Sequence, residues 1–165
     1  MVNDKIVKKV ENLPQLTAVK RTDKLIQRVA AYARVSTGKE EQQTSIVAQK
    51  EYYTDYIKSH AGWQFVGVYA DEGISGCSTK RREQFKQLMS DCMAGKIDMV
   101  LTRAIARFGR NTVDTLITIR ELKSKGIGVY FEKEQVWTMD SKGEFIITLM
   151  SSLAQEESRS MSENI

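Results

Sequence analysis

The sequence has few of the residues from which metal centres and hydrolase triads are built. Its 165 residues include two cysteines and one histidine. Cys77 and Cys92 form no Cys-x-x-Cys pair, so we expect free thiols, no bound metal and no cofactor. A single histidine excludes a Ser-His or Cys-His mechanism unless His60 itself is the base. His60 follows a helical pattern, where we expect a solvated helix end.

Long apolar runs and proline are also scarce. No stretch approaches the roughly 18 apolar residues of a membrane span, and the lysine-bearing N-terminus lacks the apolar centre of a secretory signal. We therefore expect a cytoplasmic protein without a membrane partner. The only proline, Pro14, lies in the polar and weakly patterned residues 1–27, which are predicted to form a flexible N-terminal extension.

Positive charge is concentrated in that extension. The chain has a net charge of +4, and residues 1–28 contain seven basic and three acidic side chains, so the remaining residues sum to zero. The main domain therefore has no generally basic surface. An anion site in it must come from local clustering of arginines.

From residue 28 onward, strand patterns alternate with helix patterns. Apolar runs predict four strands, at residues 28–35, 63–69, 97–102 and 127–132, and a loop at 71–82. Capping residues mark the helices between them: a start at Thr44 or Ser45, an end at Gly95, a start at Asn111 and an end at Gly126. The helix before Gly95 has an apolar stripe that includes Cys92, which we expect in the core. The alternation predicts an α/β fold of three layers, α/β/α, around a mostly parallel sheet of four to five strands.

The last pattern is a long helix that runs from about residue 143 to the end of the chain. Its apolar stripe is wider than one small sheet face needs: Ile146, Ile147, Leu149, Met150, Leu153 and Ala154. Part of the stripe is predicted to pack on another subunit, and the alternative is packing within its own domain. The predicted organisation is an extension at 1–27, a main α/β domain at 28–140 and the start of an oligomerisation helix at 141–165.

The densest chemical signal is TRAIARFGRN, residues 102–111, directly after the third strand. Arg103, Arg107 and Arg110 share one face if the segment is helical, and crowd at a strand end if it is a loop. Arginines so close repel one another unless an anion joins them, and the guanidinium fork matches phosphate oxygens two at a time. A solvated basic face is the alternative for this segment alone.

YARVST, residues 32–37, adds Arg34 and Ser36 at the end of the first strand. Because the carboxyl ends of parallel strands converge on one crevice, a serine hydroxyl and several arginines could surround one phosphate. Such a site would transfer a phosphoryl group, with arginines taking up the charge of the transition state. The nucleotide-binding loop GxxxxGK[ST] is absent from the sequence.

Five motifs follow the order found in serine site-specific recombinases: YARVST, SIVAQ at 45–49, YADEGISG at 69–76, ARFGRN at 106–111 and LAQEES at 153–158. Residues 28–165 thus resemble the catalytic domain of that family, the resolvase and invertase superfamily. The basic extension and the loop GISGCSTKRREQF look more like the large recombinases of transposons and phages. In that group DNA-binding domains follow the catalytic domain, so the resemblance implies a chain that stops before them.

The resemblance implies roles for single residues. Ser36 would attack a DNA phosphodiester and form a 5′-phosphoserine intermediate, and strand exchange and religation would follow without metal or ATP. The scissile phosphate would be bound by Arg34, Arg107 and Arg110. The other candidates are Arg82 as a further active-site arginine, Gln49 as support for the serine's loop, and Glu163 as an acidic residue near the arginines.

Ala106 departs from the family pattern, because small recombinases have aspartate there and many large ones have serine. The neighbouring arginine would lack a polar side chain that orients it, and a backbone group or a water molecule would have to substitute. The implied partners are double-stranded DNA and further copies of the chain, in a dimer and in a tetrameric synapse. Two alternatives are a non-catalytic oligomerisation or regulatory module of this fold, and a small-molecule phosphate-binding protein of the flavodoxin-like kind.

Overall fold

The computed structural model describes residues 26–37, 40–74 and 82–164, with only the backbone at 36–37, 40–45 and 73–74. The extension predicted at residues 1–27 lies almost wholly outside this part, as does Cys77. The described strands are β1 (Gln27–Thr37), β2 (Trp63–Ile74), β3 (Met99–Thr102), β4 (Gly128–Phe131) and β5 (Val136–Trp137). They form a sheet in the order β2-β1-β3-β4-β5, in which only the short β5 is antiparallel to its neighbour. The predicted, mostly parallel sheet is confirmed.

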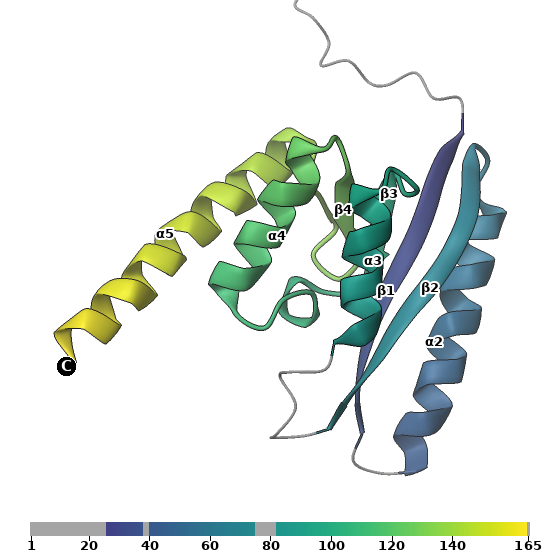
Figure 1. Cartoon of the computed structure of the whole chain (residues 1–165), viewed down its shortest axis with the longest axis horizontal. Coiled ribbons are helices and arrows are strands. Elements are labelled where there is room, and N and C mark those ends of the chain that lie inside the picture. The colour runs from purple at the N-terminus through teal and green to yellow at the C-terminus, as the bar shows by residue number, and fades with distance from the viewer. Residues whose placement is uncertain (1–25, 38–39, 75–81, 165) are drawn as a thin grey trace, which may run out of the picture.

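Helices cover both faces of this sheet, which confirms the three-layer prediction (Figure 1). The helices are α2 (Glu40–Ser59), α3 (Glu83–Met93), α4 (Thr112–Ser124) and α5 (Ser141–Glu163), with a 3₁₀ turn η1 (Ile105–Arg107). Side chains on β1 alternate between the faces: Ala30 and Tyr32 pack with α3, α4 and α5, whereas Val29 and Ala31 pack with α2. A strand buried on both faces needs apolar residues at successive positions, which explains the continuous run on β1.

Several predicted boundaries are confirmed in detail. Asn111 caps α4 by accepting a hydrogen bond from the Asp114 N–H at 2.8 Å. Gly95 and Gly126 follow α3 and α4 with φ angles of +76° and +74°, a backbone conformation that glycine adopts without strain. Cys92 is buried in the core, where desolvation raises the pKa of its thiol to about 12.

Two boundary predictions are wrong. Helix α2 begins at Glu40, so Thr44 and Ser45 lie inside the helix. Its first residues, EEQQ, are good helix formers, and the two glutamates complement the positive end of the helix dipole. Strand β2 continues to Ile74, into residues predicted as loop, because β1 pairs with it along the whole length, as far as Thr37 opposite Ile74. The two-residue β5 was not predicted.

Helix α5 packs along α4 and leaves part of its apolar stripe uncovered. Ile147 and Met150 are buried, whereas Leu149 and Leu153 are exposed. Three polar side-chain contacts join the two helices: Lys123 with Glu144, Arg120 with Ser151, and Thr112 with Glu157. Figure 1 shows the C-terminal half of α5 running away from the sheet. None of the helices in the described residues is long and apolar enough to cross a membrane.

Candidate active site

Arg34 and Ser36 lie at the carboxyl end of β1, where the sequence predicts a site. Residues two apart on a strand point to the same face, so Arg34, two residues after Tyr32, belongs to the face covered by α3, α4 and α5. Ser36 is paired in register with Gly73 of β2 and Arg34 with Asp71. The side chain of Arg34 is half-buried.

The arginine segment, residues 103–111, approaches this strand end from β3. It is not an α-helix: β3 ends at Thr102, and the segment then contains the single turn η1. The predicted alternative of a shared helix face therefore does not apply. The guanidinium of Arg107 donates a hydrogen bond from Nη1 to the backbone carbonyl of Arg34 at 3.1 Å. The structure thus brings Arg34 and Arg107 together from two different strand ends, and Arg107 remains exposed.

The far end of the segment is fixed to the start of α4. The backbone N–H of Arg110 donates to the Asp114 carboxylate at 2.9 Å, while Asp114 donates its own N–H to Asn111. A β-carbon at Gly109 would lie 2.7 Å from the backbone nitrogen of Thr115, which is closer than real contacts allow. Glycine at 109 therefore permits the close approach that sets the position of Arg110. The Arg110 side chain is exposed.

Arg82 lies beneath the arginine segment and is 6% exposed. It donates from Nε and Nη2 to the Tyr32 hydroxyl at 3.1 and 3.0 Å, and from Nη2 to the Phe108 carbonyl. Its Nη1 lies 3.7 Å from the Asp114 carboxylate. All three nitrogens of the guanidinium group thus contact protein groups in the structure, so Arg82 stabilises the position of the arginine segment. A direct contact between Arg82 and phosphate stays a prediction.

A buried chain of hydrogen bonds continues from Arg82 to β2. The Tyr32 hydroxyl donates to Asp71 at 3.0 Å, and Asp71 also accepts the backbone N–H groups of Gln84 and Phe85 at the start of α3. Burial raises the pKa of Tyr32 to about 12, so the hydroxyl keeps the proton that it donates. Sequence reasoning missed Tyr32 and Asp71 as site residues. Both stand in the quoted motifs, but only the strand register brings them together.

Comparison with known proteins agrees with this geometry. The model of the family Resolvase, N terminal domain, matches residues 29–165. The chain belongs to this family. It is 31% identical to the Tn3 transposon resolvase of Escherichia coli over 136 residues, which cover 82% of this chain and 66% of that protein. The chain thus spans slightly less than two thirds of the length of the curated relatives that it matches.

Solved structures support the same assignment of this resolvase domain. A resolvase family site-specific recombinase from Streptococcus pneumoniae is similar with a TM-score of 0.70 and 28% identity, over 84% of this chain and 92% of that one. The N-terminal catalytic domain of TP901-1 integrase is similar with a TM-score of 0.57 and 26% identity, over 81% and 98%. The family and the fold predicted from the motifs are confirmed.

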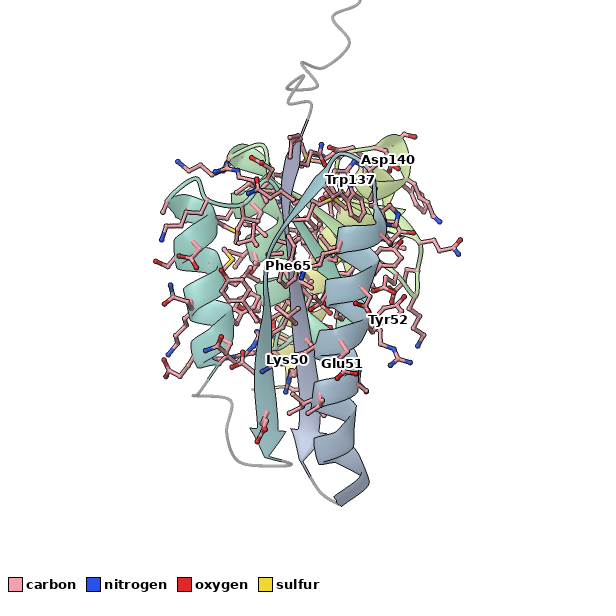
Figure 2. The ribbon with its side chains drawn as sticks, turned by 90° about the vertical axis from the view of Figure 1, so that its right-hand side faces the viewer. Lys50, Glu51, Tyr52, Phe65, Trp137 and Asp140 are labelled. Carbon is pink, nitrogen blue, oxygen red and sulfur yellow. The ribbon has the colours of Figure 1, made fainter. Side chains whose placement is uncertain are left out.

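Gln49 of the resolvase domain lies on α2, on the other face of the sheet from Arg82. It lines a pocket of about 440 Å³ together with Ala48, Tyr52, Tyr53, Arg103 and Glu132. Tyr52, labelled on α2 in Figure 2, donates its hydroxyl to Glu132 at 3.0 Å. Arg103 thus belongs to this pocket, whereas Arg107 reaches Arg34. The support that Gln49 would give to the loop after Ser36 stays a prediction, since residues 38–39 are outside the described part.

Glu163 lies in the last turn of α5, where it accepts a hydrogen bond from Arg159 of the same helix at 3.2 Å. Figure 1 shows this end of α5 well away from the sheet. Within one copy of the resolvase domain, Glu163 therefore does not lie near Arg34 and Arg107. Its predicted place near the arginines would require another arrangement of α5 or another subunit.

Proposed function

We propose that this resolvase domain is the catalytic domain of a site-specific DNA recombinase in which Ser36 is the nucleophile. The observation that carries the proposal is the contact between Arg107 and the Arg34 carbonyl, two residues before Ser36. This contact joins the Arg107 guanidinium to the backbone of the strand end that carries Ser36. Membership in the resolvase family supports the same assignment.

In the proposed reaction the Ser36 hydroxyl oxygen attacks the phosphorus of a DNA phosphodiester. The serine gives up its proton as its oxygen bonds to phosphorus, the bond to the 3′ oxygen breaks, and the 3′ oxygen takes up a proton and leaves as a hydroxyl, so the proton count balances. The 5′ phosphate stays on the serine. Attack by a 3′ hydroxyl on the phosphoserine reverses these bond changes and rejoins a strand. The energy of the ester is conserved throughout, so religation needs no ATP.

The arginines supply the electrostatic part of this mechanism. A phosphoryl group gains negative charge on its oxygens in the transition state, and guanidinium groups held in place beforehand stabilise that charge. Arg34, Arg107 and Arg110 are the proposed phosphate ligands, because Arg34 lies at the end of β1, Arg107 contacts its backbone and Arg110 follows in the same segment. The planar guanidinium group of arginine matches phosphate oxygens two at a time. Arg82, Gln49 and Glu163 are retained as proposed site residues with supporting roles.

Double-stranded DNA and further copies of the chain are the proposed partners. Apolar side chains remain exposed on α4 and α5, and the surface of these helices that carries them is called the uncovered apolar face: Val113, Ile117, Phe145, Leu149, Leu153 and Met161. Exposed apolar side chains on neighbouring helices are typical of a subunit interface. We propose that this face forms a homodimer and that two dimers form a tetramer on DNA. The proposed location is the cytoplasm, because the substrate is DNA.

Ala106 favours one alternative, a non-catalytic oligomerisation or regulatory module. Covalent capture of DNA separates the two functions. The full-length protein is mixed in EDTA with DNA that carries the ends of its element, and covalent complexes are counted on a denaturing gel. We expect attachment to 5′ DNA ends that is lost in Ser36→Ala and kept in Thr37→Ala. Specific binding without attachment would instead support the regulatory alternative.

A further inference from the structure

The turn between β4 and β5, residues 132–135, is bonded to the start of the arginine segment. The backbone N–H of Glu132 donates to the Thr102 carbonyl at 3.0 Å, and the N–H of Lys133 donates to the Arg103 carbonyl at 2.8 Å. These bonds continue the contact between β3 and β4 beyond the last residue of β3. The path of the chain is therefore fixed as it leaves the sheet toward η1.

Glu134, in the same turn, contacts the segment with its side chain. Its two carboxylate oxygens share the backbone N–H of Ile105 at 3.3 and 3.4 Å. Ile105 is the first residue of η1, directly before Ala106 and two residues before Arg107. An N–H at the start of a helical turn has no partner within the turn, so a carboxylate is a suitable acceptor for it.

The turn that carries Glu134 is itself held in place. Gln135 has a φ angle of +53°, and its N–H donates to the Glu132 carbonyl at 3.3 Å, which closes the turn. Lys142, in the first turn of α5, donates from Nζ to the backbone carbonyls of Glu134 and Gln135 at 3.3 and 3.1 Å. The backbone of Glu134 and Gln135 is thereby hydrogen-bonded to α5.

These contacts hold the arginine segment on both sides of Arg107. Glu134 binds the N–H of Ile105 before Arg107, and Arg82 binds the carbonyl of Phe108 after it. Ala106 has no polar side chain that could fix η1, so the fixation must come from neighbouring groups. We propose that Glu134 is a positioning residue that holds η1 so that Arg107 faces Arg34. In doing so it supplies the polar contact that Ala106 lacks.

The inference rests on the proposed function where catalysis is the readout. Glu134→Ala and Glu134→Gln are compared in single-turnover cleavage of DNA, with exposed Glu51→Ala as the matched control. A misplaced catalytic group can lower the reaction rate by up to about 100-fold. We therefore expect Glu134→Ala to slow cleavage about 10-fold or more, while the DNA affinity changes less than about twofold. Glu134→Gln keeps an acceptor oxygen and should retain most of the rate. Equal losses in both variants, or none in Glu134→Ala, would overturn the inference.

A second measurement does not depend on cleavage. Amide hydrogen exchange at Ile105, followed by NMR in this chain, reports directly on the proposed bond. We expect faster exchange at Ile105 in Glu134→Ala, by about 10-fold or more, and no change in Glu51→Ala. Unchanged exchange at Ile105 would overturn the positioning role. A wild-type protein that fails to cleave DNA but shows this dependence would refute the proposed function and leave the role of Glu134 intact.

Discussion

At the scale of single residues, Gly109 allows the segment that carries Arg107 and Arg110 to approach the start of α4 closely. A β-carbon there would meet the backbone nitrogen and Cα of Thr115 at 2.7 and 2.8 Å, and backbone at the start of a helix yields little. We expect Gly109→Ala to lower the free energy of unfolding by about 1–3 kcal/mol and to slow DNA cleavage, because the segment must move away from α4.

Urea unfolding and covalent capture of DNA check this prediction. Gly67→Ala is the matched control, since a β-carbon at Gly67 would meet only the Tyr69 ring, at 4.0 Å. Similar behaviour of the two variants would show that the close approach at Gly109 is not needed.

Sequence reasoning anticipated which residues of the motifs at the strand ends lie close together, while their roles at a phosphate stay predictions. Arg34 and Arg107 were both predicted, and the structure brings them into contact. It was less informative for buried polar residues. Arg82 meets Tyr32 and the Phe108 carbonyl, 50 and 26 residues away in the sequence, and no local pattern reports such distant partners.

At the scale of secondary-structure elements, a side-chain contact between Tyr69 and Asp91 joins β2 to α3. The Tyr69 hydroxyl donates to the Asp91 carboxylate at 2.7 Å, and this bond, with help from Lys96 and Gln87, lowers the pKa of Asp91 below its ordinary value of 3.8. A carboxyl group with a lowered pKa in the folded state stabilises the fold above its unfolded pKa. That stability is lost as the pH falls through the folded pKa.

We therefore expect Asp91→Asn to lower the free energy of unfolding at pH 7 and to flatten its decrease as the pH falls below about 4. Urea unfolding between pH 2 and pH 7 measures both effects, with exposed Asp55→Asn on α2 as the control. An unchanged pH profile in Asp91→Asn would show that the bond between β2 and α3 does not contribute to stability.

Elements whose apolar residues recur with a clear period were predicted correctly. Elements that form only because a neighbouring strand pairs with them were not. The stripe of α3 and the apolar runs of β3 and β4 are visible in the sequence because burial dictates their residue types. The end of β2 has the residues DEGI, of which Asp71, Glu72 and Gly73 have little strand preference, and it forms a strand because β1 lies alongside it. The two-residue β5 is too short to give a periodic signal.

At the scale of the whole molecule, the uncovered apolar face on α4 and α5 predicts self-association. Leu149 is 47% exposed, so a charge at this position should leave the fold intact and disfavour burial against a second copy. We expect Leu149→Glu to shift the chain from dimer to monomer in sedimentation velocity at the same concentration. Val47→Glu is the matched control, because Val47 is 58% exposed on α2, away from this face. A wild-type chain that stays monomeric at high concentration would contradict the proposed interface.

The central claim is that Ser36 becomes covalently joined to DNA, and locating the adduct within the protein tests it most directly. Trypsin cleaves after Arg34 and Lys39, so the site is released as the peptide VSTGK, with two hydroxyl residues, Ser36 and Thr37. After capture on DNA and nuclease digestion, tandem mass spectrometry of this peptide distinguishes the two. We predict a nucleotide linked through its 5′ phosphate to Ser36. A nucleotide on Thr37 or on another peptide, or unmodified VSTGK from captured protein, would contradict the account.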